Sequence, residues 1–170
     1  MKYEKIYLVG FMGCGKSTLG RKLAKSMGWD FVDLDDYIEE KEQQSISDMF
    51  SENGEAYFRN LETLTLKETK DWTKTVISCG GGTPCFNNNI DLINDQGFSI
   101  FINLTPEVLV DRLQGEKDKR PLIAKLSDSE LLSFIQDKLS ERLKFYNSSK
   151  MIFDYSDEKE AEFLKELSGL

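Results

Sequence analysis

A phosphate-binding loop pattern near the N-terminus constrains the fold of this chain more than any other feature. Residues 10–17 read GFMGCGKS, which matches G-x-x-x-x-G-K-[ST]. The apolar run Ile6–Val9 precedes the pattern, and apolar residues follow it at helical spacing: Leu19, Leu23, Ala24 and Met27. A strand, a glycine-rich turn and a helix N-terminus together direct backbone N–H groups toward phosphate oxygens. The pattern therefore predicts a nucleotide site in which Lys16 reaches the terminal phosphates and the Ser17 hydroxyl ligates Mg²⁺.

Strand-like and helix-like segments alternate along the rest of the chain. Apolar strands are expected at 31–34, 75–78, 99–104 and 151–153. Helices are expected over about 36–70 with a break near Asn53-Gly54, from Thr105 onward, over about 129–146 and at the C-terminus. Apolar strands that are separated by helices indicate a parallel sheet covered on both faces, which is a three-layer α/β fold.

Two of these helices carry an apolar stripe at helical spacing. The stripes are Phe58, Leu61 and Leu64, and then Leu132, Ile135, Leu139 and Leu143. No linker or repeat divides the chain, so residues 1–170 are expected to form one domain. The segment at about 114–125 reads QGEKDKRPLIAK, offers few core candidates and is expected to be a mobile loop.

Two carboxylates, Asp33 and Asp35, follow the second strand, at the edge where ligands of open parallel sheets bind. Because side chains alternate along a strand, the two would point the same way if the strand geometry continued. One could then act on metal-bound water and the other on a substrate hydroxyl. The alternative interpretation is that they cap the following helix, a role that Asp performs well.

Three glycines, Gly80, Gly81 and Gly82, follow the third strand at the same edge. Glycine permits close backbone approach to a ligand and exposes N–H donors, while a flexible turn is the alternative interpretation. Many phosphate-loop enzymes end this strand with an acidic residue on magnesium, but Ile77-Ser78-Cys79 supplies none. Asp33 is the best local substitute.

Three arginines are candidates for binding an anionic substrate. Arg59 follows Phe58 on its helix, Arg142 stands beside the apolar stripe of its helix, and Arg120 precedes a proline in the charged loop. A planar guanidinium binds a carboxylate or a phosphate with two parallel hydrogen bonds. For any one of them, a solvated surface arginine is the alternative interpretation.

The composition excludes several classes of chemistry. The chain has no histidine, so a His base, a Ser-His-Asp triad and a His-ligated zinc are ruled out. Because 22 Lys and Arg face 30 Asp and Glu, the net charge of −8 argues against a nucleic-acid binder. Three cysteines without a CxxC pair favour a reducing cytosol. The apolar run at the N-terminus is too short for a bilayer, so we expect a cytoplasmic protein without a membrane partner.

Together these motifs resemble the shikimate kinase family along almost the whole chain. The shared segments are GFMGCGKSTLGRKLA at 10–24, FVDLDDYIEE at 31–40, SISDMFSENGEAYFRNLE at 45–62, CGGG at 79–82, KRPL at 119–122 and ERLKFY at 141–146. The combination of D-x-D, F-R-x-x-E, G-G-G and R-P-L is far more specific than the phosphate loop alone. The resemblance implies a nucleoside-monophosphate-kinase-like fold with a five-stranded parallel sheet. It also implies a substrate-binding helical segment at about 35–62 and a closing lid at about 114–125.

The resemblance further implies an ATP-dependent phosphotransfer to an alcohol group of shikimate, giving shikimate 3-phosphate and ADP on the way to chorismate and the aromatic amino acids. On the nucleotide side, it implies phosphate contacts from Gly13, Cys14, Gly15, Lys16, Ser17 and Thr18. Arg112 would lie near the adenine, and Arg120 would reach the phosphates from the lid. Ser17 would ligate Mg²⁺, and Asp33 would assist through water. The loop around Tyr155-Ser156-Asp157 offers no residue that can be transferred.

On the acceptor side, the resemblance implies that Asp35 binds substrate hydroxyls and takes the proton. Arg59 and Arg142 would hold the shikimate carboxylate, and Gly80, Gly81 and Gly82 would contact the substrate. The catalytic set would be Lys16, Asp35 and Arg120. We expect a monomer.

Two other functions compete with this one. A related small-molecule kinase, such as a gluconate kinase, would preserve the phosphate loop but has no reason to keep Arg59, the glycine triplet and Arg142 together. A non-catalytic ATP-binding regulatory module would need no substrate cluster at all.

Overall fold

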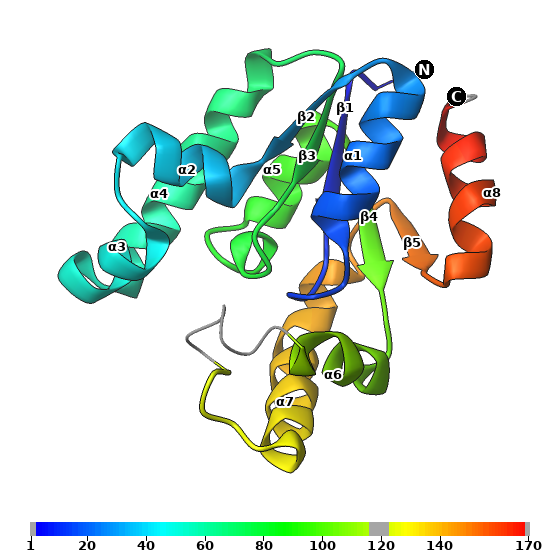
Figure 1. Ribbon diagram of the computed structural model, residues 1–170. Coiled ribbons are helices and arrows are strands. Elements are labelled where there is room, and N and C mark those ends of the chain that lie inside the picture. The colour runs from blue at the N-terminus through cyan, green and yellow to red at the C-terminus, as the bar shows by residue number, and fades with distance from the viewer. Residues whose placement is uncertain (1–2, 116–122, 169–170) are drawn as a thin grey trace.

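A five-stranded parallel sheet runs through the centre of the molecule (Figure 1). The structure is a computed structural model that describes residues 3–115 and 123–168. The strands are β1 (Lys5–Val9), β2 (Asp30–Asp33), β3 (Thr75–Ser78), β4 (Phe98–Asn103) and β5 (Met151–Asp154). Their order is β2-β3-β1-β4-β5, and each neighbouring pair is parallel. The predicted parallel α/β fold is therefore confirmed.

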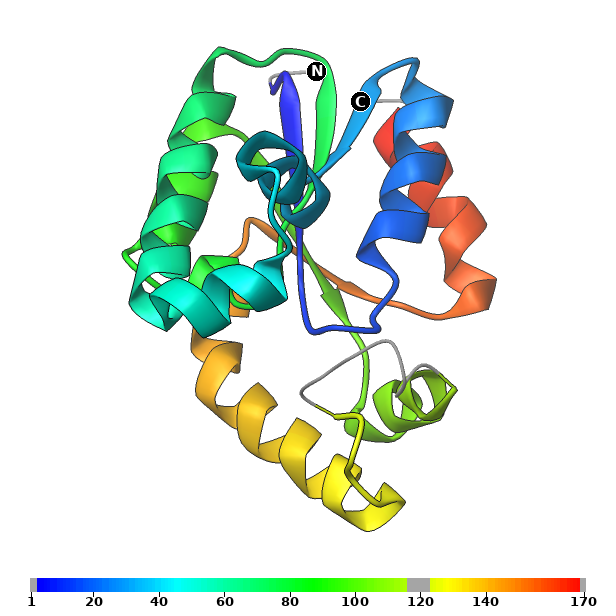
Figure 2. The ribbon, with the colours of Figure 1, turned by 60° about the vertical axis from the view of Figure 1, so that its left-hand side comes forward.

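Eight α-helices in the described ranges surround this sheet. They are α1 (Lys16–Met27), α2 (Leu34–Glu42), α3 (Ile46–Asn53), α4 (Glu55–Glu68), α5 (Asn89–Gln96), α6 (Pro106–Gln114), α7 (Asp128–Tyr146) and α8 (Asp157–Ser168), with short 3₁₀ helices η1 (Thr69–Asp71) and η2 (Thr83–Cys85). Helices α1 and α8 lie side by side on one side of the sheet, and α4 and α5 lie on the other (Figure 2). Helices α6 and α7 pack on each other at the carboxyl end of the sheet. None of the helices in these ranges has the length and hydropathy that crossing a bilayer requires.

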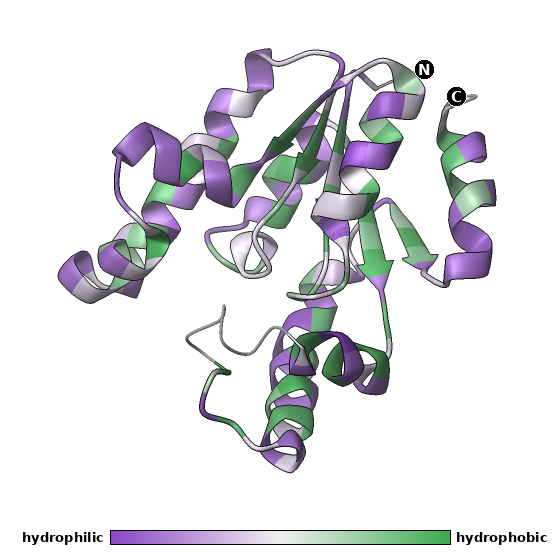
Figure 3. Ribbon diagram, in the orientation of Figure 1, coloured by the Kyte–Doolittle hydropathy of each residue, from purple (hydrophilic) through white to green (hydrophobic). Residues whose placement is uncertain are grey.

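The central strand β1 is buried along its whole length. Neighbouring strands cover both of its edges and helices cover both faces, so a continuously apolar run suits it better than an alternating one. Figure 3 shows the consequence: the strands are largely hydrophobic, whereas the helices carry hydrophilic outer faces. The fold thereby fixes the phosphate loop, which follows β1, at the middle of the carboxyl edge.

The helical region expected over 36–70 is divided into three helices. The expected break at Gly54 separates α3 from α4, but a second break separates α2 from α3. There Gln43 adopts a left-handed conformation (φ 54°) that ends α2, and Ser45 caps α3 through the amide of Asp48. The apolar spacing also fails to predict α5, because its buried residues are two isoleucines and a polar residue: Asn89, Ile90 and Ile93.

The predicted stripe on α4 is wrong at Leu64, whose side chain is 56% exposed. The inward face instead holds Phe58, Leu66 and the polar residues Glu62 and Thr65. Glu62 can be buried because it forms an ion pair with Arg59 and accepts a hydrogen bond from Thr83. The buried face of α4 therefore includes Glu62 and does not follow the apolar residues alone.

The predicted stripe on α7 is wrong at one position. Leu131 is fully buried where Leu132 was expected, while Ile135 and Leu139 are buried as predicted. The apolar neighbours Leu131 and Leu132 fit the helical spacing almost equally well, so packing decides between them.

Candidate active site

The phosphate loop joins β1 to α1 through glycines in conformations that other residues rarely adopt. Gly10 has φ 148°, and a Cβ there would lie 2.8 Å from the carbonyl oxygen of Ile102. Gly15 has φ 93° at the N-cap of α1. Lys16 is buried at the start of α1, where its Nζ donates to the carbonyl oxygens of Gly10 at 2.9 Å and Phe11 at 3.0 Å. The loop thus presents an ammonium group and a helix N-terminus to the same space, which suits a chain of phosphates.

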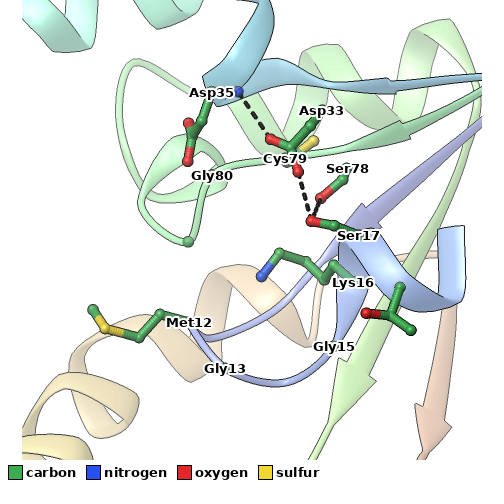
Figure 4. A pocket seen from close by; sticks show the side chains of 12 residues that line it. Met12, Gly13, Gly15, Lys16, Ser17, Asp33, Asp35, Ser78, Cys79 and Gly80 are labelled. Carbon is green, nitrogen blue, oxygen red and sulfur yellow. Dashed lines mark hydrogen bonds between the residues drawn. The ribbon is translucent and has the colours of Figure 1, made fainter. Parts of the chain in front are cut away.

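Three oxygen-bearing side chains meet beside this loop. Ser17 Oγ donates to Asp33 Oδ2 at 2.5 Å and lies 3.3 Å from Ser78 Oγ (Figure 4). The sheet register explains the meeting, because Asp33 of β2 pairs with Ser78 of β3, which pairs with Leu8 of β1. The other oxygen of Asp33 accepts from the amide of Asp35 at 3.2 Å and caps α2. The helix-cap interpretation is therefore confirmed for Asp33, which leaves Oδ2 directed at Ser17.

This donor set fits a magnesium ion. Magnesium prefers hard oxygen ligands and is usually held by one or two carboxylates together with substrate phosphates and water. Within residues 3–115 and 123–168, no group of three or more His, Cys, Asp or Glu could hold a metal ion. An ion beside Ser17 and Asp33 would therefore take its remaining ligands from a nucleotide and from water.

Asp35 lies in the first turn of α2 and faces Gly80, the first glycine of the triplet (Figure 4). A Cβ on Gly80 would stand 2.6 Å from Asp35 Oδ1, so this position requires glycine if the carboxylate is to keep its place. Burial, and then the nearby carboxylates of Glu62 and Asp33, raise the pKa of Asp35 to about 7, against a smaller opposing effect of Lys16. A carboxyl group with this pKa can both hold and release a proton near neutral pH.

Arg59 of α4 lies against the last glycine of the triplet. A Cβ on Gly82 would be 2.7 Å from Arg59 Nη1. The guanidinium donates to Glu62 at 2.6 Å and to Glu55 at 3.0 Å, and it stacks 4.3 Å from the ring centroid of Phe86. These partners fix the orientation of Arg59.

Arg142 of α7 lies against the neighbouring glycine of the same loop. Its Nη1 would lie 3.4 Å from a Cβ on Gly81, and its guanidinium lies 5.6 Å from the ring centroid of Phe11. Arg59 and Arg142, 83 positions apart in the sequence, thus stand at consecutive glycines. Two guanidinium groups at one loop offer planar hydrogen-bond donors for a carboxylate, although Glu55 and Glu62 already balance the charge of Arg59.

A cavity of about 280 Å³ connects these elements. Its lining includes the phosphate loop, both aspartates and the glycine loop, namely Met12, Gly13, Gly15, Lys16, Ser17, Thr18, Asp33, Asp35, Ser78, Cys79, Gly80 and Gly81. Cys14 was expected among the phosphate contacts. Its side chain is buried, and its carbonyl oxygen accepts a hydrogen bond from Arg112. The structure therefore brings most of the expected phosphate residues, both aspartates and two of the three glycines to one cavity. Arg59, Gly82 and Arg142 stand beside this cavity and do not line it.

On the other side of the phosphate loop, Arg112 of α6 joins the loop to the segment after β5. Its Nη1 donates to the carbonyl oxygen of Cys14 at 3.1 Å, and its guanidinium lies 5.0 Å from the ring centroid of Tyr155. Tyr155 belongs to the loop for which the resemblance offers no transferable residue, and Arg112 connects it to the phosphate loop. Arg120 and most of the expected lid, residues 116–122, lie outside the described residues.

Glu62 is the last residue of the F-R-x-x-E motif, and the sequence interpretation gave it no role. It is 1% exposed, it pairs with Arg59, and its Oε1 accepts from Thr83 Oγ1 at 2.5 Å. The signal was available, because Glu62 stands three positions after Arg59, where two side chains on one helix face can meet.

The geometry agrees with comparisons with known proteins. The model of the shikimate kinase family matches residues 12–168 of this chain. The shikimate kinase of Phocaeicola vulgatus is 44% identical over 149 residues, which cover 88% of this chain and 85% of that protein. The crystal structure of shikimate kinase from Bacteroides thetaiotaomicron has a TM-score of 0.91 at 38% identity, over 98% of this chain and 97% of that one. The structure of shikimate kinase from Acinetobacter baumannii in complex with shikimate has a TM-score of 0.85 at 28% identity, over 97% of this chain and 90% of that one.

Proposed function

The chain belongs to the shikimate kinase family, and we propose that it transfers the γ-phosphoryl group of ATP to a hydroxyl group of shikimate, giving shikimate 3-phosphate and ADP. The observation that carries this function is the position of Arg59 and Arg142 at consecutive glycines, next to a cavity that also holds Asp35 and the phosphate loop. A carboxylate-bearing, hydroxylated acceptor matches this arrangement. The guanidinium groups would bind its carboxylate, while its reacting hydroxyl would face the phosphates.

Asp35 is the candidate proton acceptor. As the acceptor oxygen bonds to the γ-phosphorus, the bond to the ADP oxygen breaks and the hydroxyl proton moves to a carboxylate oxygen of Asp35. The raised pKa of about 7 suits this transfer, because a carboxylate with the usual pKa would hold the proton too weakly. Phosphoryl transfer depends mainly on positioning and charge stabilisation, so the absence of histidine is no obstacle.

Lys16, Ser17 and Thr18 would hold the phosphates of ATP. In that state the ammonium group of Lys16, which now donates to Gly10 and Phe11, would turn to the terminal phosphates. Ser17 and Asp33 would hold Mg²⁺, and when bound this ion would neutralise charge on the β- and γ-phosphate oxygens.

Arg112 is proposed to bind at the base end of the nucleotide. The acceptor groups lie on the β2 and β3 side of the phosphate loop, so the base is expected on the β4 and β5 side, where Arg112 and Tyr155 stand.

The helical segment at about 35–62 is proposed to bind the acceptor. The lid at about 114–125 and the phosphate contact of Arg120 stay predictions of the family resemblance.

We further propose a cytoplasmic monomer that binds neither nucleic acid nor membrane. The free cysteines Cys14, Cys79 and Cys85 suit a reducing compartment, and a net charge of −8 disfavours nucleic acid.

The test is an ADP-release assay with shikimate, with gluconate and with neither acid, in the presence of Mg²⁺. We expect ADP release that depends on shikimate, and Lys16→Ala as the matched control should lose it. Release with gluconate only would favour the related kinase, and ATP binding without turnover on either acid would favour the regulatory module.

A further inference from the structure

The last residue of α7, Tyr146, ties that helix to the glycine loop. Its ring is fully buried, and its hydroxyl donates to the carbonyl oxygen of Gly81 at 2.6 Å. The ring also packs on Phe101 of β4, with centroids 5.0 Å apart. Tyr146 is therefore held by the sheet at one end and bonded to the glycine loop at the other.

Gly81 occupies the point where three parts of the site meet. It lines the cavity, and a Cβ there would lie 3.5 Å from both Gly10 O and Met12 N of the phosphate loop. The same position is 3.4 Å from Arg142 Nη1. A shift of this residue would therefore change its distances to the phosphate loop and to Arg142.

The hydrogen bond from Tyr146 fixes the orientation of a whole peptide group. The peptide unit is planar and trans, so a fixed Gly81 carbonyl also fixes the N–H of Gly82 in the opposite direction. Without a side chain, glycine samples more backbone conformations than any other residue, and three glycines in a row do not hold one orientation by themselves. The amides of Thr83 and Cys85 bond the carbonyl oxygens of Gly80 and Gly82, and the hydroxyl of Tyr146 bonds that of Gly81.

The residue that supplies this contact also stands one helical turn from Arg142. Residues four apart lie on the same face of a helix, so α7 presents its arginine and its tyrosine to the same loop. We propose that Tyr146 is a positioning residue, which holds the Gly81-Gly82 peptide in register with Arg142 so that both meet the acceptor together. The inference rests on the proposed function, because it names a determinant of acceptor binding.

Tyr7 offers a matched control within the chain. It is also fully buried, and its hydroxyl bonds to Thr69 Oγ1 at 2.6 Å and to Gln96 Oε1 at 2.9 Å. These partners lie at the C-termini of α4 and α5, and Tyr7 does not line the cavity. Tyr7→Phe and Tyr146→Phe each delete one buried hydroxyl and keep the ring, so both variants should lose stability but only one should alter the site.

The experiment measures KM for shikimate, KM for ATP and kcat in both variants, with thermal unfolding and a calorimetric titration of shikimate. We expect Tyr146→Phe to raise KM and the dissociation constant for shikimate about fivefold, the value of one hydrogen bond, and to change KM for ATP by less than about twofold. Tyr7→Phe should leave both KM values unchanged.

The inference is overturned if Tyr146→Phe leaves shikimate binding unchanged, raises both KM values equally, or shifts KM no more than Tyr7→Phe does. A wild-type chain that releases no ADP with shikimate would instead overturn the proposed function, and with it this role of Tyr146. The two failures are thus separate, because only the second appears in the wild type.

Discussion

Replacing Asp35 by Asn tests whether the acceptor side of the site is built around a carboxyl group with a raised pKa. The folded protein raises this pKa from 3.8 to about 7, so the folded state holds the proton more tightly than the unfolded chain does. Ionisation of Asp35 therefore opposes folding. The penalty is absent well below about pH 4, grows between about pH 4 and 7, and stays constant above that range.

The size of the penalty follows from the two pKa values. A rise from 3.8 to about 7 corresponds to at most about 4 kcal/mol of unfolding free energy. Asp35 lines the cavity, so water screens part of this penalty, and we expect about 2 kcal/mol of unfolding free energy. Asn keeps the shape and removes the charge, so Asp35→Asn should be more stable than the wild type by about 2 kcal/mol near pH 8 and by about 1 kcal/mol near pH 5.5.

Urea unfolding at the two pH values measures this difference, and a kinetic assay accompanies it. Asp35→Asn should lower kcat by at least about 100-fold, because the proton acceptor is lost while the fold gains stability. Glu40→Gln is the control, since it removes an exposed charge from the same helix, away from the cavity. A variant that is no more stable than the wild type at either pH would refute the reasoning, and so would a stability gain that does not grow with pH.

Three further predictions concern the remaining groups. Lys16→Ala should lower kcat about 100-fold or more at saturating ATP, with a cooperative thermal transition retained, and a near-normal rate would contradict the nucleotide site. Ser17→Ala should raise the Mg²⁺ concentration for half-maximal rate about tenfold, and an unchanged Mg²⁺ titration would remove Ser17 from the metal site. Arg59→Lys and Arg142→Lys keep the charge but lose the planar fork, so KM for shikimate should rise about tenfold and KM for ATP should hardly change, whereas equal rises would indicate general damage to the fold.

The sequence by itself determined the features that depend on residues close together in the chain. The phosphate loop is one of these, because its glycines, Lys16 and Ser17 act within eight consecutive positions between a strand and a helix. The parallel sheet is another, since a strand buried on both faces must be continuously apolar, as Ile6–Val9 is. The sequence also predicted the helix cap at Asp33, as an alternative to a role on metal-bound water.

Only the tertiary structure decided which distant side chains meet. Spacing could not favour Arg59 or Arg142 over a solvated arginine, because α4 and α7 reach the glycine loop from different directions. The exposure of Leu64 also followed from tertiary contacts, because the buried face of α4 includes Glu62 and its ion pair with Arg59. The stacking of Arg112 on Tyr155 and the hydrogen bond from Tyr146 to Gly81 belong to the same class. Local pattern records propensity and periodicity, whereas these contacts depend on how the helices pack against the sheet, which no single segment of sequence specifies.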